Sequence, residues 1–278
     1  YAQVISQDDP HDFGYLRAIG GFWSSLCALS HTAAEHGGFP YETKQMVYVI
    51  GVSFTAELLA KAMYEETVGR LATRVRGDFR TPLDTLSAQQ ARTYATFLQQ
   101  TPWYKYDFRA DLAALSEANS RLSRDQERLL ALGIEYRGKA AYAGVIAKAV
   151  AQVGADELTL RMIVSGVSKS ALAGLEGATV IETRSQGMEV EVPRYRVLTN
   201  LLVKMADIGA GFVEIAGNDD IMFTALSDTP EHDAALHSFA RQGYGDTRHL
   251  IMIPVRDLSG QLRSLPDRGL RLEHIHDY

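Results

Sequence analysis

The chain has 278 residues, enough for one large domain or two ordinary ones, and its composition is that of a folded protein with a substantial core. Its 34 acidic and 28 basic side chains give a net charge of -6 without any basic run, which excludes the usual electrostatic signature of a nucleic-acid-binding protein. The single cysteine, Cys27, excludes an intramolecular disulfide and a cysteine-rich zinc site. Its apolar helical setting predicts a small buried side chain.

Hydrophobic periodicity predicts that residues 12–154 are almost entirely helical. Successive helices are expected at 13–36, 40–75, 87–101, 109–118 and 123–153. Capping-box patterns mark two of the predicted starts, at Ser87 with Gln90 and at Ser123 with Gln126, and Gly154 marks the last end.

One stretch of this region, residues 46–64, is long enough to cross a membrane. Glu57 and Lys61 interrupt it, and a charged residue near the middle of a bilayer costs about 2.5–3.5 kcal/mol. The sequence therefore favours a buried helix of a water-soluble protein over a membrane span.

After Asp156 the pattern changes to short runs of aliphatic and β-branched residues, which predict strands at 158–166, 178–185, 188–193, 211–217, 220–226, 249–255 and 270–276. The sequences "SQG" and "GNDD" predict hairpin turns at 185–187 and 217–220. Helices are expected at 193–209 and between Glu231 and Arg241. The predicted fold class is α+β: an all-helical part, 1–154, followed by a mixed or antiparallel sheet with one or two covering helices, 155–278.

Two short patterns occur twice, in the same order, within the helical part. "FWSSLCALS" at 22–30 matches "FRADLAALS" at 108–116, and "ELLAKAMY" at 57–64 matches "EYRGKAAY" at 135–142. These matches predict a duplicated helical pair.

The second pattern carries the main candidate site. Because positions i, i+4 and i+7 share one face of a helix, Glu57, Lys61 and Tyr64 should line up, as should their counterparts, Glu135, Lys139 and Tyr142. One interpretation is a polar pocket between two equivalent helices, with a carboxylate as base and lysine or tyrosine as its electrostatic partner. The other is a structural ion-pair network that sets the register of the helices.

Two further candidates are surface features. The stretch "TPWYKYDF" at 101–108 places Trp103 and Tyr104 between two predicted helices, either as a core corner or as an anchor for a partner or ligand. Arg194 and Arg196 stand at a predicted helix start, where they could hold an anion or pair with surface carboxylates.

The tail offers the one metal candidate. His274 and His276 alternate on a predicted strand, so both rings should project from the same face, and a third ligand could come from His232, His237 or His249. The alternative is an ordinary polar strand end. No nucleotide, phosphate, zinc-protease or nucleophile-elbow motif occurs, so no cofactor is expected.

These observations lead to two functional hypotheses. The first is a non-catalytic interaction or ligand-binding protein that binds a protein partner or a small anionic ligand where its two parts meet. The second is a hydrolase or transferase that uses the Glu/Lys/Tyr groups or a His-x-His metal site. The start at Tyr1, without methionine, leads us to expect a bacterial and exported protein, in the cell envelope or periplasm, with membrane association only through a segment before Tyr1.

Overall fold

The computed structural model describes residues 1–278 except 36, 100, 154–157, 242 and 277–278. The chain forms two compact units, Tyr1–Ala155 and Asp156–Tyr278, here termed the helical unit and the sheet unit. The helical unit contains only helices, and the sheet unit contains two antiparallel sheets with helices, so the predicted α+β fold class is confirmed.

The helical unit follows the predicted order of helices closely. A π-helical turn, Glu65–Gly69, joins α3 to α4 and makes one continuous helical run of the segment predicted at 40–75. The ends predicted at His36 and Gly154 lie outside the described residues. The helices of this unit are α1 Ala2–Gln7, α2 Tyr15–Glu35, α3 Tyr41–Tyr64, α4 Arg70–Arg76, α5 Pro82–Phe97, α6 Phe108–Ala118 and α7 Ser123–Val153.

The predicted start of α5 at Ser87 is wrong. The helix begins at Pro82, with Thr81 as its N-cap, because Thr81 Oγ1 accepts the backbone N–H of Asp84 at 3.2 Å and the Asp84 carboxylate accepts the N–H of Thr81. A proline at the first helical position strengthens this start. Ser87 is therefore an interior residue, and its hydroxyl donates to the Asp84 carbonyl.

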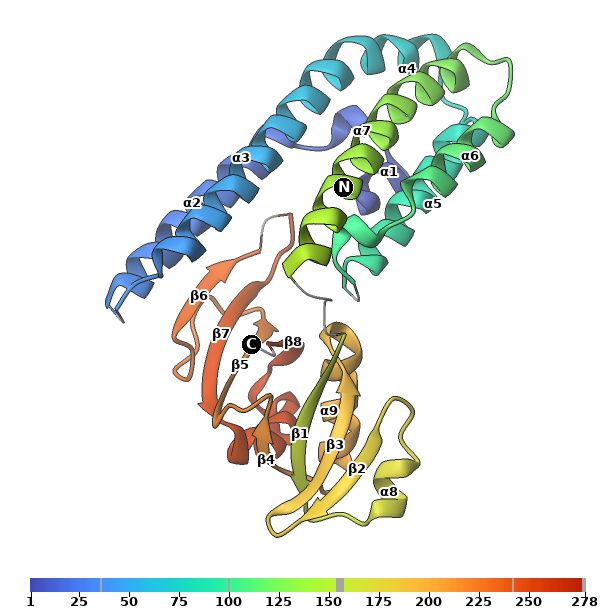
Figure 1. The fold of residues 1–278 in the computed structure, drawn as a ribbon. Coiled ribbons are helices and arrows are strands. Elements are labelled where there is room, and N and C mark those ends of the chain that lie inside the picture. The colour runs from blue at the N-terminus through green and yellow to red at the C-terminus, as the bar shows by residue number, and fades with distance from the viewer. Residues whose placement is uncertain (36, 100, 154–157, 242, 277–278) are drawn as a thin grey trace. The chain divides into compact units, whose positions relative to one another are not determined.

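The core of the helical unit lies between α5, α6 and α7, which run side by side (Figure 1). The apolar spacing of three and four residues on each helix turns one stripe toward the other two. Its buried members are Leu83, Phe108, Leu115, Leu132 and Tyr136.

The α2–α3 hairpin extends beyond this core (Figure 1), and two predictions about it are wrong. Cys27 is exposed rather than buried, and the apolar stretch 46–64 faces outward over much of its length. Helical periodicity shows that a face is apolar, but only tertiary contacts decide whether another element covers it. In this hairpin, α2 covers only one side of α3.

The sheet unit contains two four-stranded antiparallel sheets with the orders β2-β3-β1-β4 and β6-β7-β5-β8. Its strands are β1 Thr159–Ser165, β2 Thr179–Arg184, β3 Gly187–Pro193, β4 Gly211–Ile215, β5 Asp220–Ser227, β6 His237–Ala240, β7 Thr247–Pro254 and β8 Arg271–His276. Its helices are α8 Lys169–Ala173, α9 Tyr195–Asp207 and α10 Leu258–Ser264.

The two sheets repeat one topology. In each sheet the first strand lies between the third and the fourth, the second pairs with the third, and a helix joins the third to the fourth. This is the split β-α-β arrangement of ferredoxin-like folds, complete in the first sheet and without its first helix in the second. The structure therefore shows a repeat in the sheet unit, where the sequence had not indicated one.

The strand registers repeat as well. Met162 pairs with Val190 and Ile215, and 61 residues later Phe223 pairs with Ile251 and Ile275. Each sheet also has a register shift at the equivalent place. In the β1–β4 pairing it lies between Ile163 and Val164, and in the β5–β8 pairing it lies between Thr224 and Ala225. The same register with the same irregularity indicates duplication of one structural unit.

Two local predictions in the sheet unit are wrong. The segment 231–241 contains the short strand β6 instead of a helix, because its backbone pairs with β7. The "GNDD" turn is tight, with a bridge between Ile215 and Asn218, but it connects strands of different sheets and so is no hairpin. The "SQG" turn does join β2 to β3 as predicted.

Gly187 begins β3 at that turn with φ of +155°. A Cβ atom there would collide with the backbone carbonyl oxygen of Val164 on β1. We expect Gly187→Ala to destabilise the sheet unit by about 2–4 kcal/mol, because a backbone atom cannot move away as a flexible side chain can. The matched change Gly174→Ala, where the nearest atom lies at an ordinary 3.5 Å, should cost less than about 1 kcal/mol. Hydrogen exchange of the amides in β1 and β3 measures both, and equal protection in the two variants would contradict the prediction.

Candidate functional site

The two Glu–Lys pairs of the repeated pattern meet in the helical unit. Lys61 Nζ lies 3.2 Å from Glu57 Oε1 and 2.9 Å from Glu135 Oε1. Lys139 Nζ lies 3.0 Å from Glu57 Oε1 and 2.7 Å from Glu135 Oε1. Each carboxylate thus contacts both ammonium groups. We call these four residues of α3 and α7 the charge ring.

The electrostatics of the ring follow from this alternation. Burial alone would raise the pKa of Glu135, but Lys61 and Lys139 outweigh it and lower that pKa to about 2. The same balance of burial against the two lysines lowers the pKa of Glu57. Burial would lower the pKa of Lys61, but Glu135, Tyr1 and Glu57 together raise it. All these groups are therefore charged at neutral pH.

The two tyrosines of the pattern do not complete the ring. The Tyr64 hydroxyl donates to Glu127 Oε1 at 2.6 Å. Tyr142 is half-exposed and packs on Trp103, with ring centroids 5.3 Å apart. Other aromatic rings lie beside the lysines instead: Tyr1 is 5.1 Å from Lys61 Nζ, and Tyr94 is 5.4 Å from Lys139 Nζ. Cation–π contacts of this kind stabilise a charged ammonium in partly buried surroundings.

A cavity of about 410 Å³ adjoins the charge ring. Seven aromatic residues line it: Tyr1, Phe13, Phe54, Tyr94, Tyr106, Phe108 and Tyr136. Hydrogen bonds hold the polar groups of this cavity in place, because the Tyr136 hydroxyl donates to Gln90 and the Tyr106 hydroxyl donates to Asp111. An aromatic cavity with a few fixed polar groups is typical of a small-molecule site.

A second cavity of about 420 Å³ shares Tyr1, Leu132 and the charge ring with the first. Apolar residues of α7 form much of its wall, among them Leu130, Ala131 and Ile134. The charge ring therefore contributes to the walls of two largely apolar cavities and supplies most of the charge in both.

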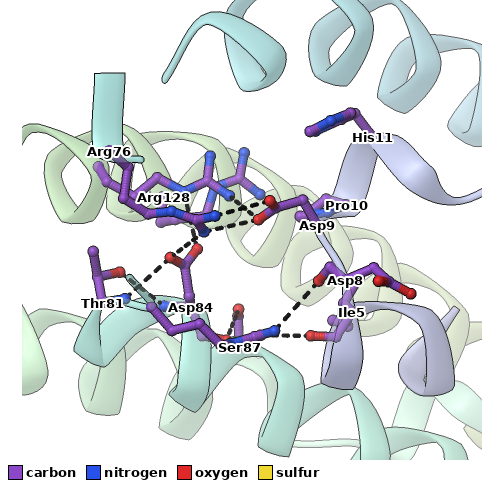
Figure 2. A network of polar contacts seen from close by, with 12 residues as sticks. Ile5, Asp8, Asp9, Pro10, His11, Arg76, Thr81, Asp84, Ser87 and Arg128 are labelled. Carbon is purple, nitrogen blue, oxygen red and sulfur yellow. Dashed lines mark hydrogen bonds and ion pairs between the residues drawn. The ribbon is translucent and has the colours of Figure 1, made fainter. Parts of the chain in front are cut away.

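Sequence reasoning missed a larger buried ion network beside the first cavity (Figure 2). Asp84 binds Arg76 Nη1 and Arg124 Nε, each at 2.9 Å, and Arg76 also binds both carboxylate oxygens of Asp9. Arg128 makes a two-point contact with Glu65 at 2.9 and 3.2 Å. The side chains of Arg124 and Arg128 are each only 1% exposed. Their i, i+4 spacing beside the apolar stripe of α7 was the available signal.

The tail histidines lie close together but form no recognisable ligand set in the part of the chain that the structure describes. The rings of His274 and His276 are 4.9 Å apart, and His274 Nδ1 lies 3.2 Å from Thr199 Oγ1. Among the described residues, the group with metal-ligand spacing is instead Asp9, His11 and Asp12. Arg76 already occupies both carboxylate oxygens of Asp9 in that group.

The third histidine named as a possible ligand, His249, is fully buried in the sheet unit. Its two ring nitrogens lie 2.8 Å from the hydroxyls of Ser227 and Ser238. Burial, and the nearby His232, lower the pKa of His249 and so favour the neutral ring. The buried ring of His249 is not accessible to a substrate, and its two nitrogens contact serine hydroxyls rather than a carboxylate. These contacts indicate a structural role.

The remaining candidates are dispersed. Arg196 Nη1 donates to the Glu273 carbonyl at 2.8 Å, and the Arg194 guanidinium lies 5.9 Å from the Tyr195 ring. Trp103 and Tyr104 are half-buried in a 3-10 turn between α5 and α6, and Trp103 packs against the core. Within the described structure, the charge ring brings predicted site residues together at both cavities, and Tyr64 joins it at the second one.

Comparison with protein-family profiles, curated protein sequences and solved structures finds no match to this chain. Function must therefore be argued from the geometry of the site itself.

Proposed function

We propose that this chain is a ligand-binding protein and that its helical unit holds a small anionic molecule with an aromatic or apolar body beside the charge ring. One observation carries the proposal: two charged lysines converge on the same carboxylate oxygens at the wall of an aromatic cavity of about 410 Å³. Sequence reasoning placed the ligand where the two parts of the chain meet, whereas this cavity lies wholly within the helical unit.

The preference for an anion follows from the unequal exposure of the two carboxylates. The Glu57 side chain is 43% exposed and that of Glu135 is 20% exposed, while Lys61 and Lys139 stay near 20%. Glu57 is therefore the member of the ring that is most easily displaced into water. A ligand carboxylate that takes its place would meet both lysines and keep the ring neutral, so no buried charge would be left unpaired.

The electrostatics favour binding over catalysis at this site. A general base works best when its pKa lies near the working pH, but the lysines lower the pKa of both carboxylates. A nucleophilic lysine needs a lowered pKa, and that of Lys61 is raised. Glu57, Glu135 and Lys61 are thus suited to hold charge rather than to transfer protons at neutral pH.

The test compares 3-phenylpropionate with its uncharged analogue, 3-phenylpropionamide, by isothermal titration calorimetry on the full chain. We expect the carboxylate to bind and Lys139→Met to weaken it at least tenfold, about 1.4 kcal/mol, with a much smaller effect on the amide. Glu57→Gln should strengthen carboxylate binding, because it removes the competing anion. Lys169→Met, at an exposed site in the sheet unit, is the control.

Equal affinity for the two probes would contradict an anion site at the lysines. No binding of either probe, with the fold retained by circular dichroism, would contradict the choice of an aromatic carboxylate for this cavity.

A further inference from the structure

The outer part of the α2–α3 hairpin is very poorly covered for an ordered pair of helices. Among the residues between Gly20 and Val52 whose side chains the structure describes, Gly51 is the one that is buried. A Cβ atom on Gly51 would collide with Phe22 and Trp23, so this glycine lets the two helices approach closely. Contact between α2 and α3 therefore accounts for one side of each helix and leaves the rest open.

The exposed surface of α3 is apolar around most of the helix. Five large side chains, 55–60% exposed, follow one another there: Met46, Tyr48, Val49, Ile50 and Val52. At 100° per residue they spread over about 200° of the circumference. A helix in a water-soluble bundle carries charged residues on its outer face, whereas one that is apolar all round is buried in protein or lipid.

The charges of the hairpin stand at its two ends. No Asp, Glu, Lys or Arg occurs between Arg17 and Glu35 on α2, or between Lys44 and Glu57 on α3. These uncharged intervals of 17 and 12 residues correspond to about 26 Å and about 18 Å of helix, so the first nearly matches the acyl-chain thickness of about 30 Å and the second covers more than half of it. We call the uncharged segments, 18–34 and 45–56, the apolar belt.

We propose that the apolar belt of the α2–α3 hairpin lies in the acyl-chain region of a lipid bilayer. The helical run Thr43–Arg76, which contains the α3 part of the belt, is the one described helix that is long and apolar enough to cross a membrane. A core helix of a soluble protein, which is mostly buried, can be equally long and apolar, but little of the apolar part of this run is buried. Lys44, at the outer edge of the belt, can extend its ammonium to the headgroups.

Lipid accounts for the belt better than a protein partner does. A second copy or another protein would cover one face of the hairpin and leave the other faces in water, where charged residues normally gather. The belt carries none on either helix. Apart from His31, the exposed residues of α2 within the belt are small and uncharged, such as Ser24 and Ala28, which membrane helices tolerate and use for close packing.

Flotation of the full chain tests this proposal. The protein is synthesised in a cell-free system with phosphatidylcholine vesicles, whose neutral headgroups exclude simple charge attraction. We expect the wild-type chain to float with the vesicles and Val49→Glu to lower the floating fraction at least tenfold. Val75→Glu places the same charge at an exposed valine of α4 outside the belt, and should float like the wild type. Tryptophan fluorescence confirms that both variants fold.

Cys27, the only cysteine, supplies a second readout, because it is exposed at the middle of the belt. A polar maleimide should label it at least ten times more slowly in the vesicle-bound chain than in detergent-solubilised chain. A reference cysteine, Ser170→Cys in a Cys27→Ser chain, should label equally fast in both. The proposal is overturned if the wild-type chain does not float, or if Cys27 labels equally fast in both preparations. If Cys27 becomes protected from the maleimide as the protein concentration rises, without vesicles, a second copy of the chain covers the belt instead of lipid.

Discussion

Asp84→Asn is expected to destabilise the helical unit by about 3–5 kcal/mol, although it changes a single oxygen to an NH₂ group. Asp84 is 4% exposed and accepts bonds from Arg76, Arg124 and the backbone of Thr81. Removing its charge leaves two buried guanidinium groups without their shared counter-ion. It also places an amide donor next to other donors, so the loss exceeds that of one hydrogen bond.

Glu66→Gln is the matched control for this change. Glu66 pairs with Arg70 at 2.7 Å, but both side chains are more than 40% exposed, so the loss should stay below about 1 kcal/mol. Both tryptophans, Trp23 and Trp103, lie in the helical unit, so tryptophan fluorescence during urea denaturation reports the stability of that unit alone. Similar losses in the two variants would show that the buried network does not stabilise the fold as inferred.

The helical unit is also expected to lose stability steeply between about pH 4.5 and pH 2. Glu135 has a pKa of about 2 in the folded chain and an ordinary value of 4.5, so the unfolded chain binds the extra proton as the pH falls through this window. Its contribution is fully present above pH 4.5 and is on the order of 2–3 kcal/mol. Glu57, Asp84 and Glu127 also have lowered pKa values and act in the same direction. Asp111, whose pKa burial raises, opposes them.

A Glu135→Gln variant separates the share of the charge ring from the rest. At pH 7 it should be less stable than the wild type, and at pH 2.5 the difference should be much smaller, because protonation of Glu135 in the unfolded chain has by then removed most of its contribution. Glu117→Gln, at an exposed position on α6, should reproduce the wild-type curve. Urea midpoints from tryptophan fluorescence at each pH give the comparison. A constant difference between Glu135→Gln and wild type across the pH range would contradict the lowered pKa.

Elements with strong local signals were predictable. The helices α2 to α7 and seven of the eight strands follow from hydrophobic period, which reflects how a helix or a strand turns one face inward, whereas the short helices α1, α8 and α10 were not predicted. The strand β6 was missed because it has only four residues, too few for a clear alternating pattern, and it is held by hydrogen bonds to β7, the strand that follows it. The start of α5 was misplaced because Ser87 resembles a cap, whereas the Thr81–Pro82–Asp84 combination is the stronger one.

The repeats show a further limit of the sequence. In the helical part, the repeated sequence patterns predicted a pairing of two helical faces. The structure does bring the Glu–Lys pairs of these faces together, with Glu57 and Lys61 beside Glu135 and Lys139. The repeat in the sheet unit has no recognisable sequence similarity, because strand pairing requires only apolar residues on the inner face, which many sequences provide. Topology and register are preserved there while identity is lost.

By itself, the sequence determined most of the longer helices and strands and the two ion pairs along α3 and α7, because these depend on neighbours within one or two helical turns. Only the tertiary structure decided that the pairs close into a ring beside a cavity, that Arg124 and Arg128 are buried, and that the apolar face of the α2–α3 hairpin is exposed. Burial and long-range pairing depend on which distant segments pack together, and local spacing does not specify that.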